Sequence, residues 1–156
     1  MTKPFWHFWR SPPKEQGAAY HPVKAECLVV EDRDDEADLL CGLLRMQGAL
    51  TTRVRSVAEA LEVLNDRAQF QVAFCDLGLP NGQGSEVIRL IRERRRGTHV
   101  VAVSGDPEKL MLALQYGLIT IMLKPYSVNA VRDLLAQAKA SAADAARYVC
   151  KYVASI

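Results

Sequence analysis

Five side chains suited to metal and phosphoryl chemistry each come directly after a short apolar run. They are Glu31, Asp32, Asp76, Ser104 and Lys124. Carboxylates held together repel one another unless a cation or protons compensate their charge. Mg²⁺ fits, because it takes one or two carboxylates and keeps water ligands that phosphate oxygens can replace. With a hydroxyl and an ammonium group added, such a set could stabilise a transferring phosphoryl group, and Asp76 is the natural nucleophile.

The apolar runs before these residues alternate with amphipathic stretches along the chain. The runs cover 27–30, 50–55, 71–75, 99–103 and 118–123. The stretches between them have apolar residues at helical spacing, and five strand-then-helix units predict an α/β fold with an open parallel sheet and helices on both faces. The second run is the most polar and suits an edge strand. In such a sheet the carboxyl ends of the strands meet at one rim, so the five side chains are expected to converge there.

Capping residues mark where the predicted helices begin. The expected caps are Asp34 or Asp35, Ser56, Asp106 and Ser127, and the third helix is expected from Ser85 to about Arg95. The apolar positions of the first helix are Leu39, Leu40, Leu43, Leu44 and Met46. The last helix keeps its apolar spacing to about Tyr148.

Composition excludes several classes of protein. With 156 residues and 49% hydrophobic content the chain can build one core, and a net charge of +2 gives no reason to expect nucleic acid as a partner. No apolar run approaches the roughly 18 residues of a membrane span, and no signal peptide is evident. The four cysteines are far apart in sequence and predict reduced thiols in the cytoplasm rather than a zinc or disulfide site.

The ends of the chain differ from its centre. Residues 1–24 contain four prolines without periodicity and are predicted to be a flexible extension, followed by one domain over 25–150 and a tail over 151–156. The aromatic cluster Phe5, Trp6, Phe8 and Trp9 could dock on a partner or touch a membrane surface, but a disordered tail is the simpler interpretation. No room is left for an output domain, so the output is expected to be a separate protein.

Five arginines gather near the end of the third predicted helix. They are Arg89, Arg92, Arg94, Arg95 and Arg96. A nucleic-acid surface is one interpretation, but a basic helix C-terminus favoured by the helix dipole is the better one.

Four sequence blocks resemble the signature blocks of the receiver domain of two-component signalling. They are Leu28-Val29-Val30-Glu31-Asp32, Asp76-Leu77-Gly78-Leu79-Pro80 with Gly84, Val103-Ser104-Gly105 and Lys124-Pro125. The resemblance covers about residues 26–140, and each block stands at the end of a predicted strand. It implies the flavodoxin-like strand order 2-1-3-4-5.

The resemblance also implies a role for each residue of the rim. Asp76 would be the phosphoacceptor, and Mg²⁺ would be bound by Asp32, Asp76 and the Gly78 carbonyl, with Glu31 acting mainly through water. Ser104 would be the switch hydroxyl and Lys124 the phosphate-pairing lysine, with Pro125 often preceded by a cis peptide. Glu31 stands where an aspartate is commoner. Ile121 occupies the place of the aromatic switch residue, so this chain departs from the family at the step that transmits the signal.

The implied partners are proteins. A sensor histidine kinase or a histidine phosphotransfer protein would donate the phosphoryl group, and the domain would act as a switch rather than as an enzyme. The usual partner face is formed by the fourth helix, fifth strand and fifth helix, which a homodimer could also use. In this chain that face is predicted to include Lys109, Gln115, Tyr116, Ile121 and Arg132.

Two other classes use similar parts. A phosphatase of the haloacid-dehalogenase type also has an aspartate nucleophile after a strand, but it needs a second acid two positions later, where this chain has Gly78. A flavodoxin-like FMN binder needs a phosphate-binding loop after the first strand, where Glu31 and Asp32 would repel the phosphate.

Overall fold

The computed structural model describes residues 25–66, 69–80, 83–95, 97–117 and 119–139. Its strands are β1 (Glu26–Val30), β2 (Leu50–Val54), β3 (Val72–Asp76), β4 (His99–Ser104) and β5 (Thr120–Leu123). Its helices are α1 (Asp34–Met46), α2 (Val57–Asn65), α3 (Gln83–Arg94), α4 (Pro107–Ala113) and α5 (Val128–Lys139), and a 3₁₀ turn, η2 (Leu114–Tyr116), follows α4. The predicted extension 1–24, the tail 151–156 and the continuation of the last helix to Tyr148 lie outside the described residues.

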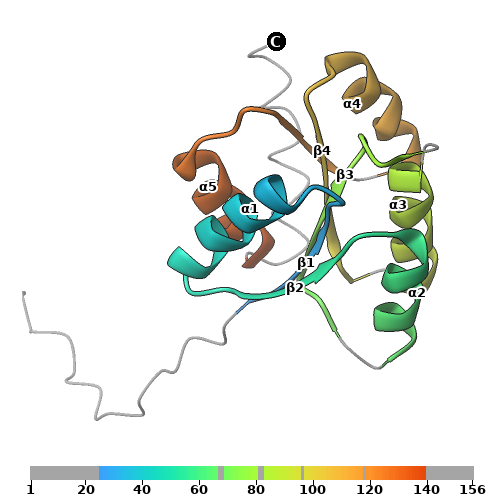
Figure 1. Ribbon diagram of the computed structural model, residues 1–156, viewed down its shortest axis with the longest axis horizontal. Helices are drawn as coiled ribbons and strands as arrows, with labels where there is room; N and C mark the ends of the chain where they lie inside the picture. Colours follow the sequence, from blue (N-terminus) through green and yellow to red (C-terminus); the bar gives the residue numbers. More distant parts are fainter. Residues whose placement is uncertain (1–24, 67–68, 81–82, 96, 118, 140–156) are drawn as a thin grey trace, which may run out of the picture.

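The five strands form one parallel sheet in the order β2-β1-β3-β4-β5 (Figure 1). This is the predicted order. All five residues of β3 are buried, as a continuous apolar run requires in a sheet covered on both faces. Only the last residue of β2 is buried, which agrees with its expected place at the edge of the sheet.

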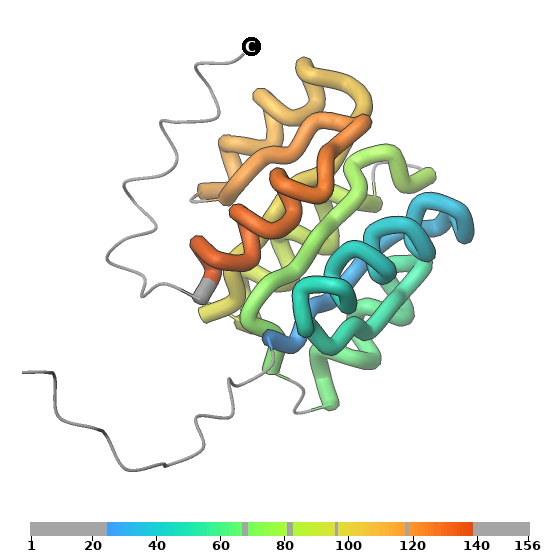
Figure 2. Tube along the Cα trace, turned by 90° about the vertical axis from the view of Figure 1, so that its left-hand side faces the viewer, coloured from blue at the N-terminus to red at the C-terminus, as the bar shows by residue number. Residues whose placement is uncertain are grey.

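Helices cover both faces of the sheet. Figure 2 shows α1 and α5 side by side on one face, and Figure 1 shows α2, α3 and α4 on the other. Two apolar clusters result, one containing Phe74 and Leu44 on the α1 and α5 side, the other containing Leu28, Ile88 and Leu110. Each such side chain stabilises the fold by about 1.5–3 kcal/mol through removal from water. The sheet is thereby held between two rigid layers.

Three of the expected helix caps are confirmed. Ser56 Oγ accepts a hydrogen bond from the Glu59 N–H at 3.2 Å, and Ser127 Oγ accepts one from the Ala130 N–H at 3.1 Å. Asp106 Oδ1 accepts one from the Glu108 N–H at 2.9 Å, just before Pro107 begins α4. These bonds satisfy donors that the first turn of a helix leaves free.

The expected cap of α1 is wrong. Arg33 holds the cap position without a side-chain cap bond, and both Asp34 and Asp35 lie inside the first turn. The Asp34 carboxylate instead pairs with Arg53 at 2.6 Å and Arg55 at 2.7 Å. Cross-element ion pairing therefore takes the carboxylate away from the helix end.

The buried face of α1 also differs from the expected one. Leu39 is 57% exposed and Met46 is 74% exposed, although both were expected on the apolar face. The buried positions are Ala37, Leu40, Cys41 and Leu44, which have the i, i+3, i+4, i+7 spacing of one helix side. Leu40 and Leu44 are buried as expected, but the small residues Ala37 and Cys41 complete this side in place of Leu39 and Met46.

The arginines at the end of α3 mostly bind within the protein. Arg94 donates to the Asn65 side chain, and Arg95 donates to the Leu64 carbonyl at the end of α2. Arg89 pairs with Glu93 at 2.8 Å. Among the described residues these bonds favour a structural role over a nucleic-acid surface, in agreement with the preferred interpretation.

Stability should fall in mild acid because of His99, the first residue of β4. Its Nε2 lies 2.9 Å from Thr120 Oγ1. Burial lowers the pKa of His99 below its ordinary 6.5, and the Arg92 charge lowers it further. The unfolded chain therefore binds this proton more readily than the folded protein does. His99 leaves the free energy of unfolding unchanged well above pH 6.5 and lowers it as the pH falls below 6.5.

The test compares the midpoint of thermal unfolding at about pH 7 and about pH 5. We expect a smaller decrease for His99→Gln, which keeps a polar group opposite Thr120, than for the wild type. Equal decreases in the two proteins would contradict the assignment to His99.

Candidate functional site

The carboxyl ends of four neighbouring strands bring the predicted residues to one rim. Glu31 and Asp32 directly follow β1, and Lys124 directly follows β5. Asp76 and Ser104 are the last residues of β3 and β4, so each of these strands ends one residue later than predicted. Asp76 is in register with Val103, so Ser104 lies one residue beyond it on the adjacent strand.

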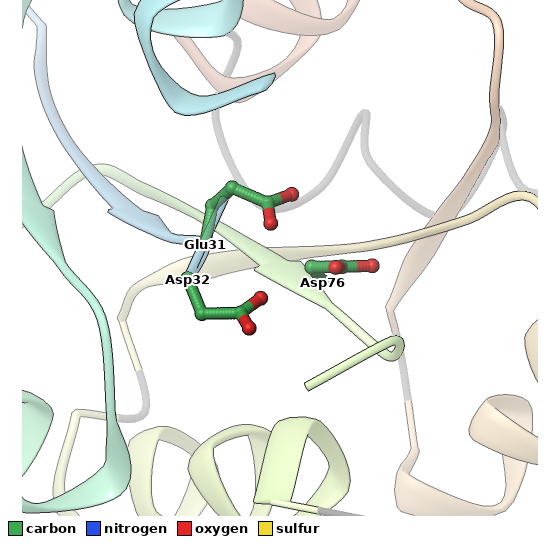
Figure 3. A group of neighbouring side chains, drawn as sticks. All are labelled: Glu31, Asp32 and Asp76. Atoms are coloured by element: carbon green, nitrogen blue, oxygen red, sulfur yellow. The ribbon is translucent and has the colours of Figure 1, made fainter. Parts of the chain in front are cut away.

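Three carboxylates meet at this rim (Figure 3). One carboxylate oxygen from each of Glu31, Asp32 and Asp76 lies within 4.8 Å of the other two. Glu31 is 4% exposed and Asp76 6% exposed, while Asp32 is more open to solvent. Bare charges at this spacing are unfavourable, so the group needs cations.

Lys124 supplies one of those cations. Its Nζ lies 3.0 Å from Glu31 Oε2 and 3.4 Å from Asp76 Oδ1, and it also donates to Glu36 Oε2. Burial alone would lower the pKa of Lys124, but hydrogen bonds to Glu36 and Glu31 and the charge of Asp76 raise it above its ordinary value. The lysine is therefore firmly protonated. The Lys124–Pro125 peptide is cis, as the resemblance implied.

Glu31 is held by the backbone as well. Its Oε1 accepts a hydrogen bond from the Arg33 N–H at 3.1 Å. Burial raises the pKa of Glu31, with a further increase from the Asp76 charge, although the Arg33 N–H and Lys124 act in the opposite direction. A further cation beside this buried carboxylate would stabilise its charged form.

The donor set fits Mg²⁺. All three acids offer hard oxygen ligands. With Glu36 the rim has four carboxylates, and among the described residues the cations paired with them are Lys124 and Arg33. This excess of negative charge suits a divalent ion that keeps several water ligands. The predicted contribution of the Gly78 carbonyl stays a prediction.

Two glycines let the backbone approach Asp76. The Gly78 N–H donates to Asp76 Oδ1 at 2.9 Å, and a Cβ at Gly78 would lie 3.0 Å from Asp76 Oδ2. A Cβ at Gly84, in the first turn of α3, would lie 2.1 Å from the Asp76 carbonyl oxygen. The start of α3 therefore packs against the backbone of Asp76 in a space that only glycine fits.

Ser104 lies at the rim, and its hydroxyl oxygen contacts the loop that follows β4. Its side chain is buried, and its Oγ accepts a hydrogen bond from the Asp106 N–H at 3.1 Å. Its carbonyl accepts one from the Lys124 N–H at 2.8 Å. In this arrangement the hydroxyl helps to shape the loop between β4 and α4.

Ile121 does not lie on the exposed partner face. It is 8% exposed and belongs to the apolar cluster that includes Ala102, Leu110 and Ala113. The expectation that it contributes to that surface is therefore wrong. The other four predicted residues of that face, Lys109, Gln115, Tyr116 and Arg132, are exposed or half-buried.

Glu36 is a site residue that sequence reasoning missed. It lies in the first turn of α1 between Asp35 and Ala37, where acids are common because of the helix dipole. That general preference hid its contact with Lys124. Glu36 and Lys124 also line a pocket of about 310 Å³ together with Leu39, Pro125 and Tyr126.

Helices long and apolar enough to cross a membrane are absent from the described part of the chain.

Comparison with protein families gives one match over most of the chain. A family model described as the response regulator receiver domain matches residues 27–136. This range includes every rim residue described above.

Curated relatives are similar over the same region. The chain is 30% identical over 117 residues to response regulator protein PilR of Pseudomonas aeruginosa, covering 74% of this chain and 26% of PilR. It is 33% identical over 114 residues to sensory transduction protein RegX3 of Mycobacterium bovis, covering 72% of this chain and 48% of RegX3. The chain thus spans a quarter to a half of these relatives.

Solved structures have the same arrangement. The receiver domain of NtrX from Brucella abortus superposes with a TM-score of 0.66 at 28% identity, covering 72% of this chain and 96% of that one. A CheY-like response regulator receiver domain from Methylobacillus flagellatus gives a TM-score of 0.67 at 26% identity, with 74% and 99% covered.

Proposed function

The chain belongs to the response regulator receiver domain family of two-component signal transduction, and from this premise we propose that Asp76 is its phosphoacceptor. One observation carries the proposal: the Asp76 carboxylate lies with two further acids within 4.8 Å and with the Lys124 ammonium 3.4 Å from Oδ1. A nucleophile, a set of metal ligands and a fixed cation thus share one rim.

The proposed reaction is a phosphoryl transfer to a carboxylate oxygen. The bond between phosphorus and the donor nitrogen of a phosphohistidine breaks as a bond to the Asp76 carboxylate forms, which yields an acyl phosphate. Asp32 and Asp76, with the Gly78 carbonyl and with Glu31 through water, would hold Mg²⁺, which neutralises charge on the transferring oxygens when bound. The Gly78 N–H orients the carboxylate by its bond to Oδ1.

Lys124 and Ser104 are proposed to contact the new phosphoryl group. Lys124 already lies beside Asp76 and needs only a small movement to reach oxygens attached to it. Ser104 Oγ accepts from the Asp106 N–H and keeps its own O–H to donate, so a turn of this side chain toward the phosphoryl group would also change the loop that begins α4. With Ile121 buried in place of an aromatic residue, α4 is the element through which we propose the signal passes.

The proposed partners are proteins. A sensor histidine kinase or a histidine phosphotransfer protein would donate, and the face of α4, β5 and α5 would contact an output protein or a second copy of the chain. Exposed apolar side chains on α4 and β5 support contact with a protein: Met111, Leu112 and Leu123. We propose a reducing, cytoplasmic setting, which agrees with Cys41 and Cys75 being buried free thiols.

The sequence disfavours the phosphatase alternative, because Gly78 stands where that class needs its second acid, and this supports a switch over an enzyme. A second acid at the place of Gly78 would need room beside the nucleophile, yet a Cβ there would already lie 3.0 Å from Asp76 Oδ2. The Asp76 carboxylate would have to shift by a few tenths of an ångström to admit it.

Removing Mg²⁺ tests the proposed function. With acetyl phosphate and Mg²⁺, intact mass spectrometry should show one added phosphoryl group, and EDTA should slow its uptake by more than about tenfold because the rim acids then repel the donor. Asp32→Asn should raise the Mg²⁺ concentration needed for half-maximal uptake. Asp38→Asn, which removes a charge from a side chain 81% exposed on α1, is the matched control and should not change it.

Failure of the wild type to gain a phosphoryl group, both from acetyl phosphate and from a phosphohistidine donor, would overturn the proposal. Uptake at the same rate in EDTA would overturn the metal requirement alone.

A further inference from the structure

Glu36 connects α1 to the lysine of the rim. Its Oε2 accepts a hydrogen bond from Lys124 Nζ, and its Oε1 lies 3.0 Å from Arg33 Nη1. The Glu36 side chain is 25% exposed and that of Lys124 is 19% exposed, so this ion pair is partly shielded from water. Glu36 therefore binds two cations, one on each oxygen.

The Lys124 ammonium is shared among three carboxylates, and two of them, Glu31 and Glu36, accept hydrogen bonds from it. An ammonium group has three N–H donors, and three carboxylates surround it: Glu31 at 3.0 Å, Asp76 at 3.4 Å and Glu36. A phosphoryl group on Asp76 brings further anionic oxygens to the same ammonium. To move toward these oxygens, the ammonium would have to lengthen its contact with Glu36, so that the two anionic groups compete for it.

Glu36 is the carboxylate best placed to be exchanged. Glu31 and Asp76 lie at the ends of the central strands β1 and β3, whereas Glu36 lies on the helix beside them. If Lys124 leaves Glu36, the carboxylate keeps Arg33, whose own side chain is 62% exposed. Its charge is then not left unpaired, which keeps the cost of the exchange low.

We propose that Glu36 is a positioning residue that holds Lys124 toward α1 and competes with the phosphoryl group on Asp76 for the lysine ammonium. The inference rests on the proposed function of Asp76. Through this competition α1 would set how readily the phosphorylated form is reached and how long it persists.

Three variants separate contact from charge. Glu36→Gln removes the charge, and Glu36→Asp keeps the charge but shortens the arm by one methylene, so that the carboxylate loses its reach to Lys124. Asp35→Asn is the matched control, because Asp35 lies in the same turn and pairs with the same Arg33, at 3.2 Å, but is not among the carboxylates that pair with Lys124. If contact matters, both Glu36 variants should behave alike and differ from Asp35→Asn.

The first measurement is the affinity for beryllofluoride, a phosphoryl mimic, at saturating Mg²⁺, followed by isothermal titration calorimetry of the full chain. We expect the dissociation constant to fall about twofold to fivefold in Glu36→Gln and Glu36→Asp, the effect of losing one partly exposed competing ion pair. Asp35→Asn should match the wild type. The acetyl phosphate assay should show a longer-lived acyl phosphate in the same two variants.

The second measurement needs no metal. Acetylation of Lys124 by acetic anhydride, mapped by peptide mass spectrometry, should be faster in both Glu36 variants than in the wild type, with the exposed Lys109 as internal reference. A merely structural role of Glu36 would move the unfolding temperature without this selective change at Lys124.

Two results would overturn the inference. One is a Glu36→Asp protein with wild-type beryllofluoride affinity and wild-type Lys124 reactivity. The other is an Asp35→Asn protein that shifts as much as Glu36→Gln, which would show a general charge effect. Failure of the proposed function gives a different pattern, because the wild type itself would then bind no beryllofluoride, and the inference would be overturned with it.

Discussion

Asp76→Asn is expected to abolish phosphoryl uptake from acetyl phosphate, with no added mass detectable under conditions that modify the wild type. The amide cannot form the acyl phosphate, and its oxygen is a far weaker nucleophile and metal ligand than a carboxylate. The substitution keeps the shape of the side chain. It also keeps an oxygen that can accept the hydrogen bond from the Gly78 N–H, which is 2.9 Å long to Oδ1 in the wild type. The loss should therefore be chemical, with the fold retained.

Intact mass spectrometry after incubation with Mg²⁺ and acetyl phosphate measures this effect directly. Asp133→Asn on α5 is the control, since Asp133 is half-exposed and pairs with the neighbouring Arg132 at 3.2 Å, away from the rim. It should be modified like the wild type. One phosphoryl group retained in a folded Asp76→Asn protein would place the phosphoacceptor elsewhere.

Gly84→Ala should have the largest effect on stability. A Cβ at this position would lie 2.1 Å from the Asp76 carbonyl oxygen and 2.9 Å from Leu77 Cα, and both are backbone atoms that cannot rotate away. The start of α3 must then move off the end of β3. Overpacking of this kind typically lowers the free energy of unfolding by about 1–3 kcal/mol, and backbone contacts this short favour the upper end or more.

Urea unfolding followed by circular dichroism gives the comparison, with Gly42→Ala as the matched control. Gly42 lies inside α1, and a Cβ there would meet nothing within 4 Å. Alanine should therefore stabilise the protein by about 0.5–1 kcal/mol through its higher helix propensity. Equal unfolding midpoints for the two alanine variants would show that α3 can move away from Asp76 without cost.

The two expectations meet at one place in the fold. Gly84 keeps α3 close to the backbone of Asp76, and Gly78 keeps the following loop close to its carboxylate. A partly folded Gly84→Ala protein should therefore also accept the phosphoryl group more slowly. The phosphoacceptor depends on the helix beside it as well as on the strand that carries it.

Much of the fold was predictable because its signals are local. An apolar run such as Val72–Cys75 is buried on both faces of a sheet, and the structure places it in the central strand β3. Ser56, Asp106 and Ser127 were identified as caps from their own short-range chemistry, and their bonds are present. Asp34 failed as a cap because arginines of another element, Arg53 and Arg55, take its carboxylate.

Burial was harder to predict than secondary structure. Leu39 is exposed and Ala37 is buried on the same helix, because α1 turns the side that carries Ala37, Leu40 and Leu44 toward the core. Ile121 is buried for a similar reason: it follows the strand pleat toward the cluster under α4. The hydrophobicity of a side chain does not say which side of a helix or strand the rest of the fold will cover.

By itself the sequence determined which groups stand at the rim, because the residue after a parallel strand is fixed to the carboxyl end of the sheet. Glu31, Asp76 and Lys124 are brought together by this rule alone. Only the tertiary structure decided which first-turn acid of α1 reaches Lys124. Glu36 and Lys124 are 88 residues apart, and their contact depends on the rotation of one helix against the end of β5. The neighbouring Asp35 carries the same charge one residue away and pairs with Arg33 instead, because a step of one residue turns a helical side chain by about 100°.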